Sequence, residues 1–292
     1  MAFLLQNDDM TQVRITPELE RWIVDQAMAG REPDVVVRSM RDAGWSEADA
    51  MEAVDRVVRD HLDQNARETG LPPAVRVPAP IVANGASVLD AGDRKVCVLA
   101  NMLLPRVVLF GGLLSEQECD ALIEVARPRM SRSTTVDPGN GGDLVHEART
   151  SRGTFFPRAF DAMFAAIEAR IARLLEWPAD HGEGLQILHY GPGAEYKPHY
   201  DYFDPALPGS EPLLRRGGQR VASLVMYLNT PECGGATTFP DVRFEAAAIK
   251  GNAVFFSYDR PHPMTRSLHG GAPVVAGEKW VATKWLRERA HL

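Results

Sequence analysis

The apolar positions of the N-terminal part recur with a helical period. Thr16 before Pro17 predicts a helix start, because a threonine N-cap often precedes proline at the first helical position. This helix is expected to run through PELERWIVDQAMAG to near Gly30. A second helix is expected over 33–44, and a third opens at Ser46 and continues through EADAMEAVDRVVRDHL. Three short amphipathic helices predict a small helical bundle over residues 1–70.

A different pattern begins after a stretch rich in Pro, Gly and Ala, 71–95, which is interpreted as a linker. Within 96–292 a capping box predicts a helix at Ser115, and 158–177 has the helical period of the longest helix. Short strand-like runs bounded by Gly and Pro follow at 185–190, 195–201, 220–228, 236–239, 252–258, 273–276 and 279–286. Many short strands after a few helices predict an α+β fold, with an antiparallel sandwich or jelly roll flanked by helices.

Composition narrows the class of protein. The chain has 292 residues, is 45% hydrophobic and 24% charged, and carries a net charge of -7, which argues against a general nucleic-acid binder. No apolar run reaches the roughly 18 residues of a membrane span, so no membrane partner is expected. The N-terminus lacks the pattern of a signal peptide. Three cysteines, odd in number and far apart, predict a reducing, cytoplasmic environment.

Two metal-ligand residues stand two apart in the run YKPHYDYFD. On a strand, His199 and Asp201 point to the same face, so they form two ligands of a metal site if a third group joins them. Two histidines and one carboxylate are the facial triad of non-haem Fe(II) oxygenases. His269 is the candidate for the third ligand, and His262 is its rival. The alternative is a hydrogen-bonded surface pair that binds no metal.

A lysine and a tyrosine favour the metal site over the hydrogen-bonded surface pair. Lys279 lies on a predicted strand, where its ammonium can pair with the distal carboxylate of a dicarboxylic cosubstrate. Tyr190 can give the same carboxylate a hydroxyl donor. The alternative for Lys279 is an exposed strand lysine. The combination of all five residues favours a site for a metal and a 2-oxo acid.

At these residues the sequence resembles the prolyl 4-hydroxylase branch of the 2-oxoglutarate/Fe(II) dioxygenases. The runs are QILHYGPGAEYKPHYDYFD, RVASLVMYLNTPECGGATTFP, GNAVFFSY and SLHGGAPVVAGEKWVATKW, and the likeness covers roughly 105–287. It implies a double-stranded β-helix and, as cofactors, Fe(II), 2-oxoglutarate and O2, with ascorbate as a further candidate. The implied residues are the iron ligands His199, Asp201 and His269, the 2-oxoglutarate contacts Lys279 and Tyr190, and the substrate contacts Arg220, Tyr196 and Trp285.

The resemblance implies hydroxylation of a prolyl residue in a peptide or protein, as in procollagen-proline 4-dioxygenases. Asp201 is intact, so the halide-binding variant of this chemistry is not expected. Arg287 stands where some relatives have a histidine, and the polar loops 133–147 and 203–219 are expected to close over the substrate. Two alternatives remain: a hydroxylase of a free amino acid or other small molecule, and a catalytically silent jelly-roll binding module.

The N-terminal bundle, with AGW between its second and third helices, resembles ubiquitin-associated (UBA-type) three-helix domains over about 16–63. This loose likeness implies recruitment of a protein partner. The alternative is a helical extension that packs on the enzyme core.

Overall fold

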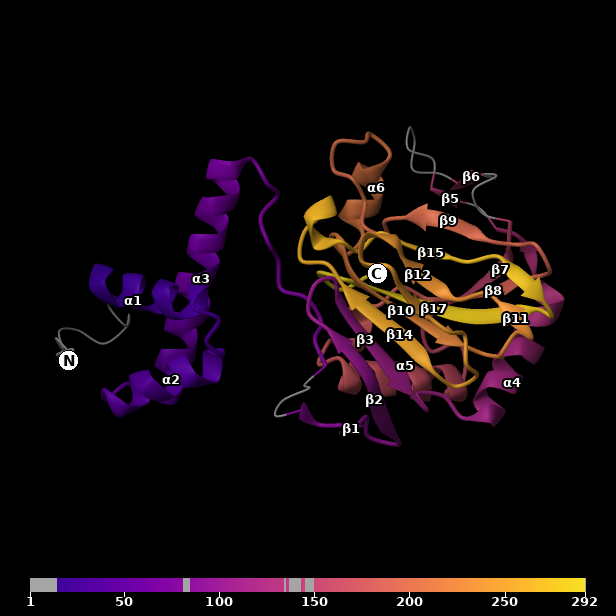
Figure 1. Ribbon diagram of the computed structural model, residues 1–292, viewed down its shortest axis with the longest axis horizontal. Coiled ribbons are helices and arrows are strands. Elements are labelled where there is room, and N and C mark those ends of the chain that lie inside the picture. The colour runs from indigo at the N-terminus through magenta and orange to yellow at the C-terminus, as the bar shows by residue number, and fades with distance from the viewer. Residues whose placement is uncertain (1–14, 81–84, 134, 137–142, 145–149, 292) are drawn as a thin grey trace. The chain divides into compact units, whose positions relative to one another are not determined.

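The computed structural model describes residues 15–80, 85–133, 135–136, 143–144 and 150–291, and it divides into two compact units at Ala74/Val75 (Figure 1). The first unit holds three helices, α1 (Pro17–Met28), α2 (Pro33–Asp42) and α3 (Glu47–Thr69). They enclose a core of their own, formed by Leu19, Ile23, Val36, Met40, Ala50, Ala53, Val54 and Val57.

Local capping sets the ends of these helices. The Thr16 hydroxyl accepts a hydrogen bond from the backbone N–H of Leu19, and that of Ser46 accepts one from Asp49, so both predicted helix starts are confirmed. α3 ends at Gly70, which adopts a left-handed conformation with φ of 70°. With 23 residues α3 is longer than the 13-residue α5, so the prediction that 158–177 is the longest helix is wrong.

The second unit is a sandwich of two antiparallel sheets with helices against the outer face of the larger one (Figure 1). This mixed arrangement fits the predicted jelly-roll core. The larger sheet has the order β1 (Val88–Asp90), β2 (Lys95–Met102), β3 (Arg106–Gly111), β14 (Ala253–Ser257), β10 (Arg220–Tyr227), β17 (Lys279–Arg287), β8 (Leu185–Tyr190), β7 (Arg152–Phe156), β4 (Ser131–Arg132). The smaller sheet has the order β13 (Phe244–Ala246), β12 (Thr237–Phe239), β15 (His269–Gly271), β9 (Tyr196–His199).

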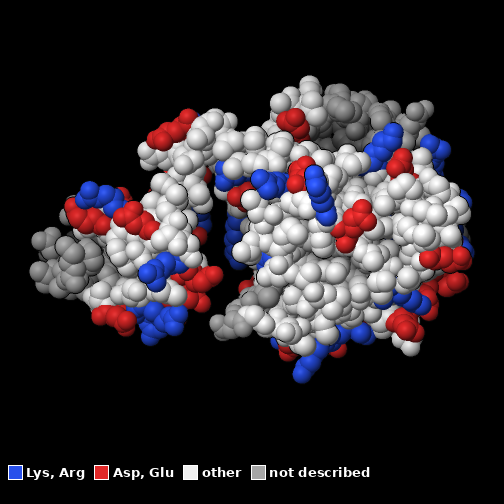
Figure 2. All heavy atoms as spheres, viewed as in Figure 1, with Lys and Arg blue, Asp and Glu red and all other residues white. Residues whose placement is uncertain are grey.

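Further elements complete this unit. Two short pairs join β11 (Cys233–Gly234) to β16 (Val274–Ala276) and β5 (Thr135–Val136) to β6 (Asp143–Leu144). The helices are α4 (Glu116–Ala126), α5 (Ala162–Leu174) and α6 (Ser210–Arg215), with single 3-10 turns at Arg127–Arg129, Ala179–His181, Pro240–Val242 and Pro263–Thr265. No helix among the described residues is long and apolar enough to cross a membrane. On the face seen in Figure 2, basic and acidic side chains are interspersed.

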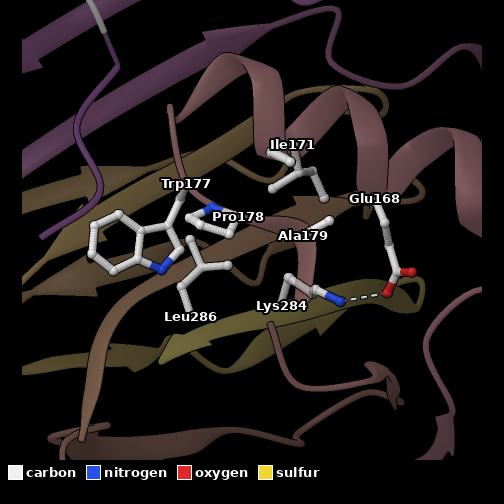
Figure 3. A pocket seen from close by; sticks show the side chains of 8 residues that line it. Glu168, Ile171, Trp177, Pro178, Ala179, Lys284 and Leu286 are labelled. Carbon is white, nitrogen blue, oxygen red and sulfur yellow. Dashed lines mark hydrogen bonds and ion pairs between the residues drawn. The ribbon is translucent and has the colours of Figure 1, made fainter. Parts of the chain in front are cut away.

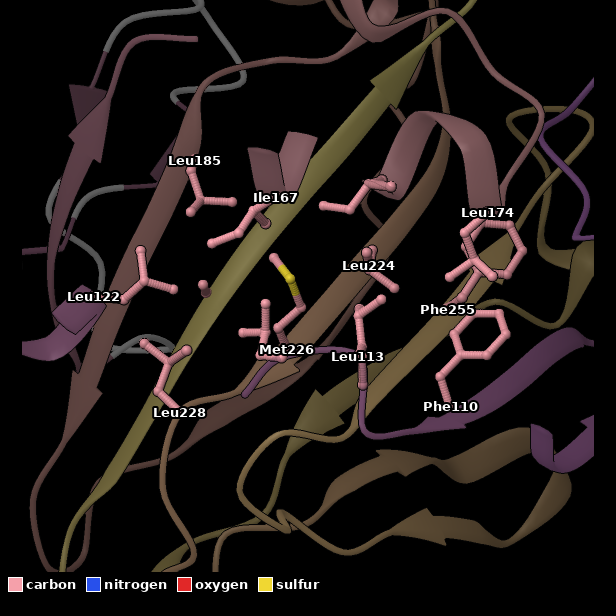
Figure 4. Close-up of a cluster of buried hydrophobic side chains, with 14 of the residues drawn as sticks. Phe110, Leu113, Leu122, Ile167, Leu174, Leu185, Leu224, Met226, Leu228 and Phe255 are labelled. Carbon is pink, nitrogen blue, oxygen red and sulfur yellow. The ribbon is translucent and has the colours of Figure 1, made fainter. Parts of the chain in front are cut away.

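Strand alternation sorts the core into two layers. On β14, Phe255 faces the helices, whereas Val254 and Phe256 face the smaller sheet. The helix-side layer packs side chains of β10, β14 and α5 together, and Figure 4 shows part of it. Its members include Phe110, Leu113, Leu122, Ile167, Leu174, Leu224, Met226 and Phe255.

Some element ends differ from the predictions. The helix expected over 158–177 begins only after Asp161, whose carboxylate caps it by accepting from the N–H of Phe164. The strand expected over 195–201 ends at His199, so Asp201 follows the strand instead of lying on it. His269 lies within β15. In the stretch interpreted as a linker, Val75 and Val77 pack on the second unit's core, and the N–H of Val75 bonds Asp259 O.

One strand, β17, carries two buried lysines on opposite faces. Lys284 faces the helices and pairs with Glu168 of α5, whose other carboxylate oxygen accepts from the N–H of Ala159 (Figure 3). The cavity beside this pair is about 10 Å³, the room of roughly one water molecule. Lys279, an odd number of residues away, points to the face that the smaller sheet covers. The period of the strand therefore gives the two lysines different surroundings.

We predict that Lys284→Met lowers the free energy of unfolding by about 3–5 kcal/mol, because it leaves Glu168 as a buried charge without its partner. The double variant Lys284→Met/Glu168→Gln should recover most of this loss, since glutamine still accepts from Ala159. Lys250→Met is the matched control: its pair with Asp120 is exposed, and its loss should cost less than about 1 kcal/mol. Urea unfolding of the full chain measures all three, and a fully stable Lys284→Met would contradict the account.

Candidate metal and cosubstrate site

Two histidines far apart in sequence meet through strand pairing. β9 and β15 are antiparallel neighbours, and His199 lies directly opposite His269 in their register. Directly opposed residues project their side chains from the same face of a sheet. The two ring centroids lie 4.4 Å apart. The smaller sheet therefore presents both imidazoles toward the larger one.

Backbone carbonyls fix the orientation of both rings. Nδ1 of His199 lies 2.9 Å from the carbonyl of Lys197, and Nδ1 of His269 lies 3.0 Å from that of Ser267. A carbonyl only accepts, so each Nδ1 carries the proton and donates it, which leaves each Nε2 with a free lone pair. Burial lowers the pKa of His199, and the neighbouring His269 lowers it further. The neutral, metal-binding form of His199 is therefore favoured.

Asp201 completes the cluster from the segment that follows β9. Its two carboxylate oxygens lie 3.5 Å from Nε2 of His199 and 3.4 Å from Nε2 of His269. Burial by itself raises the pKa of Asp201, and when His269 and His199 are protonated their positive charge and Nε2 hydrogen bonds hold it well below its usual value; a cation bound at both Nε2 atoms would take over that role. Asp201 is thus an ionised carboxylate that is only 8% exposed.

These three residues form the one group of potential metal ligands found among the described residues, with ligand atoms within 4.8 Å of one another. The rival His262 is not part of it: its Nδ1 accepts from the N–H of Met264 and caps a 3-10 turn. His189 faces away and bonds Glu278 at 2.8 Å. Two imidazole lone pairs and a carboxylate that converge in a buried place fit a divalent cation, and this donor set suits Fe(II).

Lys279 reaches the strand that carries His269, since its Nζ lies 3.7 Å from where a Cβ on Gly271 would stand. It is directly opposite Tyr190 across β17 and β8, and its Nζ is 5.4 Å from the tyrosine ring centroid. The side chain is 4% exposed, and burial lowers the pKa of its ammonium to about 8. Burial is the one cause of this shift, and no carboxylate among the described residues offsets it. A buried, unpaired ammonium fits the distal carboxylate of 2-oxoglutarate.

Comparison with known proteins places the chain in a family. The family model of the 2OG-Fe(II) oxygenase superfamily matches residues 185–287. Two relatives in Arabidopsis thaliana, probable prolyl 4-hydroxylase 3 and prolyl 4-hydroxylase 5, are each 40% identical, over 62% of this chain and 69% and 68% of their own lengths. The chain belongs to the prolyl 4-hydroxylase-like 2-oxoglutarate/Fe(II) oxygenases. It is also similar to the solved viral collagen prolyl hydroxylase of Paramecium Bursaria Chlorella virus-1, with 30% identity, a TM-score of 0.48 and coverage of 62% of this chain and 95% of that one.

The protein is thus a 2-oxoglutarate-dependent dioxygenase that uses Fe(II), 2-oxoglutarate and O2. The matched range contains every residue that the sequence predicted for the site: His199, Asp201, His269, Lys279, Tyr190, Arg220, Tyr196 and Trp285.

The predicted substrate contacts of this oxygenase surround the cluster. Tyr196 stacks on His199, with ring centroids 3.7 Å apart. The guanidinium of Arg220 lies 4.0 Å from the ring centroid of Trp285 and forms a two-point ion pair with Glu183, at 2.7 and 2.8 Å. Nε1 of Trp285 has no hydrogen-bond partner among the described residues. Arg220 and Trp285 thus form one unit beside the metal-ligand group.

The side chain of Arg287 turns inward. It is 2% exposed, pairs with Glu183 at 2.9 Å, and donates to the carbonyls of Leu213 and Arg216 at the end of α6. Within the loop 203–219, the Gln219 amide both accepts from the N–H of Phe203 and donates to its carbonyl, each at 2.7 Å. The two ends of this loop are therefore hydrogen-bonded to each other. The other expected loop, 133–147, lies mostly outside the described residues.

Sequence reasoning missed three buried polar residues of the oxygenase site: Glu183, Ser223 and Tyr258. Ser223 interrupts the apolar run VASLVMY at a position that faces the site, and this was a usable signal. Glu183 gave no such signal, because its importance depends on two arginines distant in sequence.

The buried ammonium of Lys279 predicts how stability depends on pH. Its pKa is about 8 in the folded chain and near 10.5 when unfolded, a difference of about 3 kcal/mol that destabilises the folded apoprotein below pH 8. As pH rises from 8 to 10.5 the folded chain loses the proton first, so the penalty shrinks. We therefore predict that Lys279→Met unfolds at higher urea concentration than wild type near pH 7, and that the difference vanishes near pH 10.5. Equal stability at neutral pH would contradict this.

Proposed function

We propose that this protein hydroxylates a prolyl residue in a peptide or protein, with Fe(II), 2-oxoglutarate and O2. The observation that carries the proposal is the pairing of two unsatisfied groups in one site. One is the convergent set of His199, Asp201 and His269, and the other is the buried ammonium of Lys279, for which the described residues offer no carboxylate partner. The 40% identity to prolyl 4-hydroxylases of Arabidopsis thaliana supports prolyl as the substrate residue.

Each residue has a proposed role in this reaction. His199, Asp201 and His269 hold Fe(II), and Lys279 and Tyr190 grip the distal carboxylate of 2-oxoglutarate. Bound together, iron and 2-oxoglutarate supply the activation of O2 that C–H hydroxylation requires. The chain's own tasks are to fix three ligands on one side of the metal, to orient the cosubstrate and to exclude water.

Arg220, Tyr196 and Trp285 are the proposed substrate contacts. Their support is their position: Tyr196 stacks on a ligand histidine, and the Arg220–Trp285 unit flanks Asp201, whose carbonyl lies 3.5 Å from Arg220. A free amino acid or other small molecule is the second candidate substrate. A catalytically silent binding module is disfavoured, because a buried lysine with no carboxylate partner among the described residues is costly to the fold unless a ligand compensates its charge.

Two further proposals concern an additional cofactor and the cellular location. Ascorbate is proposed as an additional cofactor, one that keeps the iron reduced. A cytoplasmic location is proposed from the three cysteines, each of which is free in the structure.

We predict that the wild-type protein, supplied with Fe(II), 2-oxoglutarate and a panel of proline-containing peptides, adds one oxygen atom to a prolyl residue. His199→Ala, Asp201→Ala and His269→Ala should each abolish both iron binding and turnover, because two remaining ligands hold Fe(II) poorly. His262→Ala and His189→Ala are matched controls that should bind iron as wild type does. Mass spectrometry of the peptides and an anaerobic iron titration measure the outcomes.

Two results would count against the proposal. Full activity of Asp201→Ala would refute the metal site. Oxidation of free amino acids with no peptide product would instead shift the substrate to the second candidate.

The N-terminal unit is proposed to be a UBA-like module that recruits a protein partner. Its support is a self-contained core and the exposure of large apolar side chains such as Met28 and Met51, 76% and 58% exposed. The alternative is that these helices stabilise the oxygenase unit.

We predict that deletion of residues 1–70 leaves turnover of a short peptide almost unchanged and weakens turnover of the intact protein target. The cut falls before Val75, which bonds the second unit and must stay. Peptide and protein kinetics measured on the same preparation separate the two roles. A truncated protein that aggregates, or whose melting temperature falls, would favour the stabilising role over recruitment.

A further inference from the structure

Asp201 lies where strand pairing no longer holds the backbone. β9 ends at His199, and Asp201 begins the segment that leads to α6. Its carboxylate nevertheless accepts a short hydrogen bond, 2.6 Å, from the hydroxyl of Ser223 to Oδ2. The hydroxyl of Tyr258 lies 3.0 Å from the same serine oxygen. A chain of two hydroxyl groups therefore ends on the carboxylate.

The direction of these hydrogen bonds follows from the chemistry of the groups. The Ser223 hydroxyl donates its single proton to Oδ2 of Asp201. The serine oxygen is then an acceptor, and the proton between the two hydroxyls must come from Tyr258. Hydrogen bonds aligned in this way polarise and strengthen one another.

The centre of the larger sheet anchors this chain of hydroxyls. Ser223 is fully buried on β10, where it pairs with Phe256 of β14 on one side and Trp285 of β17 on the other. Tyr258 follows β14 directly, and its N–H bonds the carbonyl of Val221 at 3.0 Å. Three adjacent strands thus fix the position of the serine hydroxyl, which in turn restrains a side chain on an unpaired segment.

We propose that Ser223 and Tyr258 are positioning residues that hold the carboxylate of Asp201 in its metal-binding orientation. Because Ser223 occupies Oδ2, the carboxylate is presented to the metal mainly through Oδ1. This inference rests on the proposed metal-ligand role of Asp201. Residues that orient a metal ligand in this way typically contribute about 10- to 100-fold to metal affinity.

The test measures the dissociation constant of Fe(II) anaerobically in the full chain, with circular dichroism as the check on folding. Ser223→Ala should bind Fe(II) about 10- to 100-fold more weakly than wild type. Tyr258→Phe should weaken binding less, and the double variant should bind no more weakly than Ser223→Ala, because Tyr258 acts through the serine.

Matched controls remove equivalent groups that do not reach Asp201. Ser257→Ala removes another buried hydroxyl of the same sheet, and Tyr227→Phe removes a buried phenol that donates to Thr237. Both should keep wild-type affinity for Fe(II). If Ser223→Ala does not fold, Tyr258→Phe compared with Tyr227→Phe carries the same test.

The results separate this inference from the proposed function. Wild-type affinity in folded Ser223→Ala, together with loss of binding in Asp201→Ala, would overturn the positioning role alone. Wild-type affinity in Asp201→Ala would overturn the metal site itself. Equal weakening by Ser257→Ala and Ser223→Ala would also overturn the positioning role, since it would show a general effect on the sheet.

Discussion

The convergence of three acceptors, two of them buried and one half-buried, is the constraint on which the site depends. Two imidazole lone pairs and one carboxylate face a common point, and the strand register of β9 and β15 leaves the histidines no other arrangement. Such a set is unfavourable without a positive charge at its centre. A divalent cation meets this need, and it explains why the chain keeps an ionised aspartate in a place that is almost closed to solvent.

The two lysines of β17 show that a buried positive charge likewise needs a partner of opposite charge. Lys284, on the helix face, has a carboxylate partner in Glu168, and the two charges compensate each other. Lys279, on the site face, is equally buried but has no such partner among the described residues. Burial of a charge is costly unless it is compensated, so an uncompensated ammonium marks a place where a ligand carboxylate binds. We propose that the dicarboxylic cosubstrate of this oxygenase family supplies that group.

The sequence predicted the residues that carry chemistry better than the residues that orient them. His199, Asp201, His269 and Lys279 were recognised because their types are rare in strands and their order matches a family. Ser223 and Glu183 were missed, since their partners are set by cross-strand register and by long-range pairing that no local pattern shows.

The ends of elements show the same limit in the fold. The end of α3 had a signal in Gly70, but the last turns of the helix are polar, so the apolar period stopped before the helix did. The start of α5 depended on the Asp161 cap, which the longer apolar pattern over 158–177 concealed. Arg287 was noticed only as a departure from relatives; that it ties Glu183 to the end of α6 required the three-dimensional arrangement.

We propose that the metal-ligand group and Lys279 form one site for iron and 2-oxoglutarate. An anaerobic titration of the Fe(II)-loaded protein with 2-oxoglutarate, followed by the metal-to-ligand charge-transfer absorption, tests it most directly. Wild type and the surface control Lys250→Met should both give a saturable band. In Lys279→Met we predict about 10- to 100-fold weaker affinity, the loss of one charge-assisted hydrogen bond. No band in wild type, or the same affinity in Lys279→Met, would contradict it.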